Sequence, residues 1–201
     1  MKIRRIILFA TVSLLVVVAG VTARLATQNP GYSHPSFTLH SQLYRHGQLT
    51  GNETLSFFPN GDFREQKRDG DHNYGTARIR GVGFFVIDDS QQWIRKDARV
   101  NFQEVLRVPS LEQLRQSPNY VKDDTVLGFP AVMLRQVNAE TGKPVAEWWF
   151  APAVTGSAMI KRISYDLESG DQLTRTEPVY VDYAQPDPSL LKLPNYRVIE
   201  K

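Results

Sequence analysis

Beyond residue 36 the chain alternates hydrophobic and polar side chains with the period of two that is typical of half-buried β-strands. In the segment 37–44 (FTLHSQLY), Phe37, Leu39 and Leu43 fall on one face and mostly polar side chains on the other. Roughly nine to eleven such runs follow at near-regular spacing, each bounded by turn-forming residues. The pattern predicts a mainly β fold, a single domain over residues 37–201 built on one antiparallel sheet that curls on itself.

Turn residues that tolerate positive φ mark three hairpins in this domain. They lie at Asn60-Gly61, at Thr141-Gly142 and at residues 168–171 (ESGD). After the first of these turns, the run 63–68 (FREQKR) is polar on nearly both faces, so we expect an edge strand or a solvent-facing arm there. A further extended run is predicted over residues 91–108.

Only the segment 109–116 (PSLEQLRQ) has a helical pattern. Ser110 is a favoured N-cap residue, Leu111 and Leu114 share a face, and Pro118 ends the pattern. The C-terminal segment 185–198 is predicted to form a short helical turn followed by an extended end. We therefore expect one or two short helices beside the sheet.

The N-terminus carries the strongest targeting signal in the chain. Lys2, Arg4 and Arg5 precede an apolar run, Ile6 to Val21, in the order of an export signal. As a helix this run spans about 24 Å, which is short of the roughly 30 Å hydrocarbon core of a bilayer. Residues 1–23 are therefore interpreted as a signal peptide or as a hydrophobic helix that stays as a signal anchor, and the sequence leaves both open.

Residues 24–36 (RLATQNPGYSHPS) contain two prolines and a glycine and are interpreted as a tether. With either fate of the N-terminal run, the domain that follows is expected on the outer side of the cytoplasmic membrane. The predicted location is extracytoplasmic, in the periplasm, with the domain either free or anchored to the inner membrane.

The basic pI of 9.2 comes from the N-terminal segment. Residues 1–29 hold four basic side chains and no acid, which leaves 20 basic and 21 acidic residues in the rest of the chain. No stripe of Lys and Arg with interleaved aromatics remains, so we do not expect a nucleic-acid partner. The chain has no cysteine, which excludes a disulfide framework, a thiol nucleophile and a cysteine-based zinc site.

The patterns that would support a metal site or catalysis are incomplete. Three of the four histidines follow one another at six-residue spacing, about 20 Å along a strand, which is too far to share an ion. The segment 69–75 (DGDHNYG) begins like a calcium loop, but Tyr74 and Arg80 stand where such a loop needs glycine and glutamate. No Gly-x-Ser-x-Gly elbow is present. We expect no metal, no cofactor and no catalytic residue.

Aromatic residues recur as neighbours along the chain. They stand at Phe57-Phe58, at Phe84-Phe85 and at residues 148–150. Because adjacent residues of a strand point to opposite faces, each group puts a large ring on both faces of the sheet. Either the sheet is covered on both sides, or its second face holds an apolar ligand in a groove or cavity.

The segment 146–154 (AEWWFAPAV) is predicted to be the central strand of the sheet. Trp148 and Phe150 share one face of this strand, and Glu147 and Trp149 share the other. The carboxylate indicates that the Glu147 face meets water or a groove, whereas the Trp148 face meets the core. Trp149 is therefore the main candidate for contact with a ligand.

From Val126 onward the order of short motifs resembles the LolA/LolB-like superfamily of periplasmic lipoprotein carriers and related exported proteins. The motifs are VLGFPAVMLRQ, GKPVAEWWFAPAV, IKRISYD and PDPSLLKLPNYRV. The resemblance implies a strongly curved antiparallel half-barrel with helices set into its concave side, around a cavity that accepts acyl chains. Carried over by position, the lining residues would be Trp148 or Trp149, whichever faces inward, with Phe150, Met133 and Ile160. The chain departs from the carriers in having one predicted helix instead of several, and in lacking the lipid-anchoring cysteine of the receptor branch.

These observations favour a non-enzymatic, extracytoplasmic binding module for an apolar ligand, which would be a lipid, an acyl chain or an apolar peptide. The alternative is a protein-interaction or sensor domain anchored in the membrane by residues 6–23, with a membrane-associated protein as its partner. A hydrolase of an unrecognised type is the third hypothesis.

Overall fold

A computed structural model describes residues 36–97, 109–156 and 158–199 of the chain. The predicted N-terminal helix and residues 98–108 of the predicted run 91–108 lie outside these ranges. Within them, no helix has both the length and the hydrophobicity needed to cross a membrane. All described elements belong to one compact unit, His34–Lys201, which holds its own cores, as a domain that folds by itself does.

The described chain forms strands almost throughout. In the first half these are β1 (Phe37–Arg45), β2 (Gln48–Phe57), β3 (Phe63–Asp69), β4 (His72–Ile79), β5 (Gly83–Asp88) and β6 (Trp93–Lys96). The second half contains α3 (Leu111–Arg115), β7 (Tyr120–Val126), β8 (Phe129–Val137), β9 (Pro144–Phe150), α4 (Pro152–Thr155), β10 (Met159–Tyr165), β11 (Gln172–Asp182), the 3-10 helix η1 (Pro188–Leu191) and β12 (Arg197–Val198).

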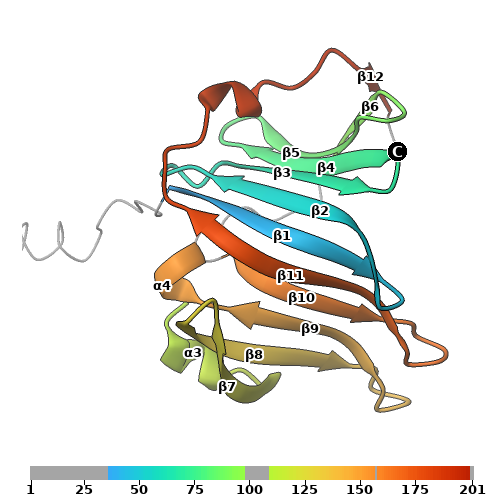
Figure 1. Cartoon of the computed structure of the whole chain (residues 1–201), viewed down its shortest axis with the longest axis vertical. Helices are drawn as coiled ribbons and strands as arrows, with labels where there is room; N and C mark the ends of the chain where they lie inside the picture. The colour runs from blue at the N-terminus through green and yellow to red at the C-terminus, as the bar shows by residue number, and fades with distance from the viewer. Residues whose placement is uncertain (1–35, 98–108, 157, 200–201) are drawn as a thin grey trace, which may run out of the picture. The chain divides into compact units, whose positions relative to one another are not determined.

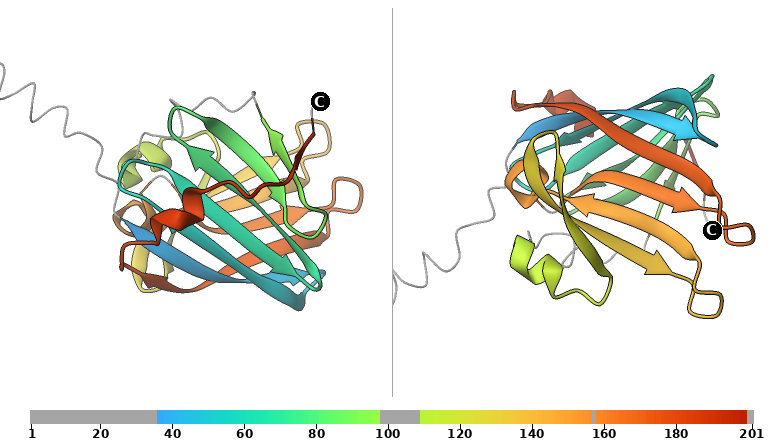
Figure 2. Two further views of the ribbon diagram at one scale, coloured as in Figure 1. Left: turned by 90° about the horizontal axis from the view of Figure 1, so that it is seen from above. Right: turned by 60° about the horizontal axis from the view of Figure 1, so that its bottom comes forward.

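The twelve described strands make one open, curved sheet in the order β12-β6-β5-β4-β3-β2-β1-β11-β10-β9-β8-β7 (Figures 1 and 2). All neighbouring strands are antiparallel except β12, which runs parallel to β6. The predicted mainly β class, the curved antiparallel sheet and the short helices are confirmed. Strand β9 is third from the β7 edge, so the prediction that it is central is wrong.

The turn chemistry acts as the sequence predicts. Gly61, Gly142 and Gly170 adopt positive φ values of 83°, 68° and 81° in the three predicted hairpins. The predicted helix forms as α3, where Ser110 accepts a hydrogen bond from the backbone N–H of Gln113 and the Gln113 side chain accepts one from the Ser110 backbone.

Because the strands alternate in direction, their connections gather at two ends of the sheet. We call the end where β1 begins the proximal end; it carries the turns 58–62, 80–82 and 127–128 and the connection that contains α4. The opposite, distal end carries the turns 46–47, 70–71, 89–92, 138–143 and 166–171. In Figure 1 the proximal end lies at the left.

Strand β3 is not the edge strand or solvent-facing arm that its polar sequence predicts. It pairs along its whole length with β2 on one side and β4 on the other. Arg64 and Lys67 are 6% and 9% exposed, because both form ion pairs within the fold. A polar strand therefore runs through the interior of the sheet.

The C-terminal segment covers the outer face of the sheet over β4, β5 and β6. Phe85 and Ile87 of β5 form a cluster with Ala77 and Ile94, against which Leu193 and Tyr196 pack. Phe84, the neighbour of Phe85, points to the inner face. In this doublet one ring, Phe85, is covered by the chain, and the other, Phe84, lines a groove.

Two glycines bring backbones close together around β3. A Cβ atom added at Gly75 would lie 2.0 Å from the carbonyl oxygen of Glu65, and one added at Gly51 would lie 1.7 Å from that of Arg68. Both contacts are with backbone atoms, which cannot turn away as a side chain would. The close packing of β2, β3 and β4 thus depends on glycine at these two positions.

Candidate functional site

A groove of about 670 Å³ lies on the inner face of the sheet. The groove is lined by α3 and by side chains of strands as far apart in the sheet as β5 and β9. Because the sheet is curved, side chains from such distant strands meet only on its concave side. Its size is within the range of small-molecule sites, about 300–1,000 Å³. Its lining is mainly apolar towards the proximal end and charged towards the middle of the strands. The lining residues are Glu53, Leu55, Phe57, Phe63, Glu65, Lys67, Thr76, Phe84, Pro109, Leu114, Phe150, Ala158, Met159, Ile160, Lys161, Arg162 and Thr176.

The apolar part is built from a row of aromatic rings on neighbouring strands. Phe57 stacks on Phe37 with ring centroids 5.4 Å apart, and on Phe63 at 6.1 Å. Phe63 meets the edge of Phe84 at 6.1 Å. The row forms because every second residue of β2 and β3 points inward, and the inward positions at the proximal end are aromatic.

The charged part consists of two carboxylates and two cations that face one another. The Lys67 ammonium lies 2.7 Å from Glu65 and 3.5 Å from Glu53, and Arg162 lies 3.1 Å from Glu53 and 3.9 Å from Glu65. Thr76 donates a hydrogen bond of 2.9 Å to Glu65. We call Glu53, Glu65, Lys67 and Arg162 the charged cluster; its formal charge is zero.

Burial acts differently on the two carboxylates of the charged cluster. Burial, with the nearby charge of Glu65, raises the pKa of Glu53 above its ordinary value, although Arg162 and Lys67 oppose the shift. For Glu65 burial also opposes ionisation, but Lys67, Arg162 and the hydrogen bonds outweigh it and lower the pKa. Attraction within the charged cluster thus outweighs burial for Glu65 but not for Glu53.

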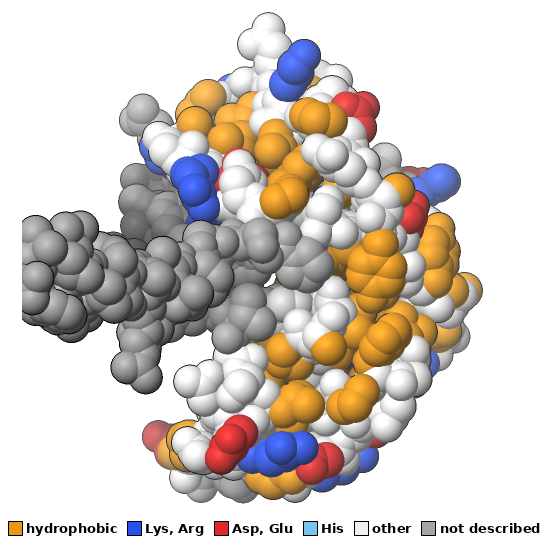
Figure 3. Space-filling model, turned by 90° about the vertical axis from the view of Figure 1, so that its left-hand side faces the viewer, with side chains coloured by type: hydrophobic (Ala, Val, Ile, Leu, Met, Phe, Trp, Pro, Cys, Tyr) orange, Lys and Arg blue, Asp and Glu red, His pale blue; other side chains and the backbone are white. Residues whose placement is uncertain are grey.

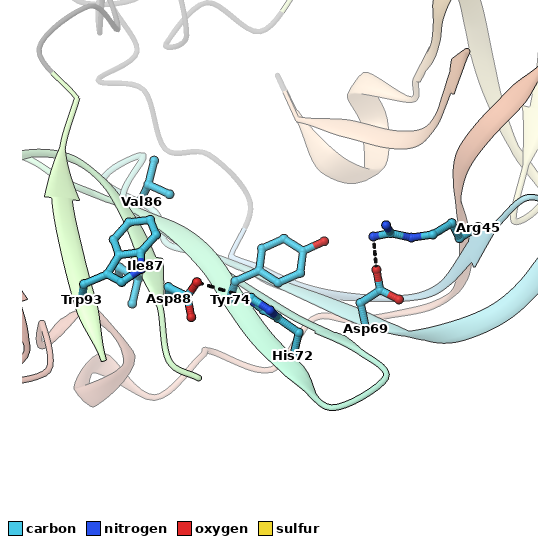
Figure 4. Close-up of a pocket in the computed structure, with 8 residues that line it drawn as sticks. All are labelled: Arg45, Asp69, His72, Tyr74, Val86, Ile87, Asp88 and Trp93. Carbon is cyan, nitrogen blue, oxygen red and sulfur yellow. Dashed lines mark hydrogen bonds and ion pairs between the residues drawn. The ribbon is translucent and has the colours of Figure 1, made fainter. Parts of the chain in front are cut away.

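A second hollow, of about 520 Å³, lies further towards the distal end (Figure 4). In it Arg45 pairs with Asp69 at 2.5 Å, and His72 lies 3.1 Å from Asp88. The nearby Thr50 side chain, with the pairing to Arg45, lowers the pKa of Asp69. Tyr74 of this hollow is the cross-strand neighbour of Lys67, whose ammonium lies 5.8 Å from the Tyr74 ring centre.

The predicted site residues divide between the groove and the core. Phe150 and Ile160 line the groove. Met133, with 3% of its surface exposed, packs in a core cluster instead. Trp148 packs against Leu114 of α3 and its cluster and is half-buried.

The expectation that Glu147 and Trp149 meet water or a groove is wrong, since each is only 5% exposed. The Trp149 indole N–H donates a hydrogen bond of 2.9 Å to Asp124, and Lys161 lies 4.8 Å from the Trp149 ring centre. Glu147 is paired with Arg135 at 2.7 Å. A polar residue on this face does not signal exposure, because partners on neighbouring strands satisfy it.

The Glu147 carboxylate of β9 also contributes to a raised pKa at Tyr165 of β10. Burial, together with a hydrogen bond to Glu147, raises the pKa of Tyr165 to about 12. Glu147 is thus held among Arg135 and Tyr165 as part of the structure of the sheet.

Sequence reasoning missed the charged cluster. Its members stand on β2, β3 and β10, and Arg162 is 109 positions from its partner Glu53. The one available signal was the polar run 63–68, which indicates buried ion pairs if the strand is interior. No group of three or more His, Asp or Glu side chains in the described ranges could hold a metal ion.

Comparisons with known proteins give matches in structure alone. No family model and no curated protein sequence matches the chain. Among solved structures, the chain is similar to MucB, with 18% identity and a TM-score of 0.45 over 89% of this chain and 64% of that one. It is also similar to MucB in complex with MucA(peri), with 17% identity and a TM-score of 0.46 over 83% and 57% of the two chains. The chain thus spans less than two thirds of either MucB chain.

A third match is the LolA superfamily protein NE2245 from Nitrosomonas europaea, with 7% identity and a TM-score of 0.28 over 82% of this chain and 93% of that one. The name of this third protein contains the superfamily that the sequence motifs resemble.

Proposed function

We propose that the chain is an extracytoplasmic, non-enzymatic binding module for an acyl chain that carries a polar head. The observation that carries the proposal is the groove, which is apolar at one part and charged at the other. Ligand sites are typically concave and mainly apolar, with a few polar groups that fix the orientation of the ligand. The groove has this composition.

The proposed position of the ligand follows from the two parts of the groove. The alkyl chain lies against Phe57, Phe63 and Phe150, where apolar surface of the ligand and of the rings leaves water together. The head lies near Lys67 and Arg162, whose N–H groups are donors for a carboxylate or phosphate oxygen. Phe150 and Ile160 thus keep the role that the sequence predicts for them.

The extracytoplasmic location is proposed from the N-terminal sequence, in which basic residues precede the apolar run. This location would place the domain where lipids and exported lipid-modified proteins are handled.

Native mass spectrometry of the unit His34–Lys201, exported behind an added cleavable signal peptide and then purified, tests the proposal directly. We expect a co-purifying mass that corresponds to a lipid or fatty acid. A fluorescent fatty acid should bind the emptied protein, and Ala158→Phe, which adds a ring to the groove lining, should weaken this binding at least tenfold.

The matched control is Tyr180→Ala, which removes an exposed aromatic ring that does not line the groove. It should bind the fatty acid as the unchanged protein does. Two results together would overturn the proposal and favour the protein-interaction alternative. The first is a purified protein that never carries a co-purifying lipid, and the second is equal binding of the fluorescent fatty acid by the Ala158→Phe and Tyr180→Ala variants.

A further inference from the structure

The proximal end of the sheet exposes large apolar side chains on several separate connections. Val82 is 49% exposed in the turn between β4 and β5, and Tyr183 is 52% exposed where β11 ends. Leu127, Phe129 and Met159 are 37%, 38% and 39% exposed at the β7–β8 turn and the start of β10. Figure 3 looks onto this side of the molecule and shows hydrophobic side chains gathered on it.

Leu127 occupies a position that is unfavourable for leucine in two ways. It begins the two-residue turn Leu127-Gly128, in which its φ is 53°, a left-handed value that favours asparagine or glycine. Its side chain is also left partly in water at the tip of the hairpin. A strained, exposed apolar residue is evidence for a role in contact with something outside the fold.

The two ends of the sheet differ in charge. The distal turns carry one lysine, Lys143, and six acids, which are Asp71, Asp89, Glu140, Asp166, Glu168 and Asp171. The turns 58–62 and 80–82 carry one acid, Asp62, which is 4% exposed, and one base, Arg80. Around Tyr183 the proximal end also carries the exposed Asp182 and Asp187, and Asp97 follows β6. The distal end also exposes Leu49, Val137 and Leu167, but these stand among the acids. An anionic lipid surface would therefore repel the distal end, with its six acids and one lysine, more strongly than the proximal end.

The chain reaches the sheet at the proximal end. Phe37 is the first residue of β1, and residues 24–36 separate it from the apolar N-terminal run. Thirteen residues reach at most about 45 Å. The groove continues to the same end, because Met159 belongs both to its lining and to the exposed apolar group.

From these four observations we infer that the proximal end is a membrane-contacting surface, which sits on a bilayer through Val82, Leu127, Phe129, Met159 and Tyr183. The groove then opens towards the lipid, and the acidic turns point away from it. The inference does not depend on whether the groove holds an acyl chain.

Single cysteines test the inference, because the chain has none of its own. Val82→Cys and Tyr183→Cys mark the proximal end, and Leu49→Cys and Leu167→Cys, which are 57% and 58% exposed as leucines, mark the distal end. Each full-length variant is labelled with a polarity-sensitive dye and reconstituted in vesicles of phosphatidylethanolamine and phosphatidylglycerol. Lipids that carry a nitroxide should quench the two proximal labels at least twofold and leave the distal labels unchanged.

A second measurement uses the unit His34–Lys201 and the same vesicles in a flotation assay. Leu127→Asn keeps the turn, because asparagine favours this φ, and removes an apolar side chain. We expect about tenfold weaker vesicle binding. Leu167→Asn is the distal control and should bind as the unchanged unit does.

Equal quenching at both ends, or no quenching at the proximal end, overturns the inference, as does equal vesicle binding by the two asparagine variants. Displacement of a fluorescent fatty acid is measured on the same proteins. Loss of that signal in every protein contradicts the proposed function alone, so the two failures are distinguishable.

Discussion

Glu53 is a carboxylate with little contact with water inside the groove, and its raised pKa makes the free energy of unfolding depend on pH. The unfolded chain ionises this group near 4.5, whereas the folded protein holds the proton to a higher pH. The contribution of Glu53 to stability is therefore fully present below pH 4.5 and is lost as the pH rises through the folded pKa.

Glu53→Gln removes this dependence, because glutamine does not ionise. We expect the stability of the variant, relative to the unchanged protein, to increase between pH 4 and pH 7. Urea unfolding at the two pH values measures the difference. A relative stability that falls over this range would show that the ion pairs with Arg162 and Lys67 outweigh burial.

Lys67 is the cation nearest to Glu65 in the charged cluster, at 2.7 Å, and it also lies 3.5 Å from Glu53. Lys67→Met leaves Glu53 and Glu65 with Arg162 alone, so we expect a loss of about 3–5 kcal/mol in the free energy of unfolding. Arg45→Met breaks an ion pair whose arginine side chain is 53% exposed and should cost less than about 1 kcal/mol. Urea unfolding of the two variants checks the contrast, and equal losses would contradict it.

Among the elements, β3 packs so closely against β4 that its pairing requires a glycine at position 75. Gly75→Ala would place a Cβ atom 2.0 Å from the backbone oxygen of Glu65, so β4 must move away from β3. We expect a loss of about 2 kcal/mol or more, in the range of substitutions that strain a packed backbone. Thermal unfolding measures the loss. Thr76→Ala, which adds no atom and removes a methyl group and a hydroxyl that donates to Glu65, is the control and should cost less.

The sequence predicts those elements whose signals are local. The three hairpins depend on glycine in positive φ, and α3 depends on a capping box, so neighbouring residues are enough to identify them. The class of fold follows from the alternation of side chains in the same way.

Features that depend on distant strands could not be predicted. The run 63–68 looks exposed because its partners, such as Arg162, are on strands that the sequence does not place beside it. The prediction for Trp149 is wrong for the same reason, since Asp124 and Lys161 cover this side chain from two other strands. For the candidate site, two of the residues carried over from the resemblance, Phe150 and Ile160, line the groove, but the charged cluster requires knowledge of the sheet order.

At the scale of the whole molecule, a ligand in the groove couples strands from both halves of the sheet. A ligand that binds only the folded protein stabilises it by about 2.7 kcal/mol when its free concentration is 100 times Kd. For a domain of this size that is a rise of roughly 5–10 °C in the unfolding temperature.

Differential scanning fluorimetry with and without a saturating fatty acid measures this shift. The shift should be small in Ala158→Phe, whose added ring narrows the groove, and full in Tyr180→Ala. A shift of equal size in both variants would place the stabilising site outside the groove.

The charged cluster inside the groove has no net charge, and this affects which ligands the groove selects. An incoming head group displaces no excess counter-ions, so binding should vary little with ionic strength. A head of either sign finds an opposite charge at about the same depth, since Lys67 and Arg162 alternate with Glu53 and Glu65. Discrimination between ligands would then come from how well the length and branching of the hydrocarbon fit against the row of aromatic rings. The chemistry of the head group would contribute little.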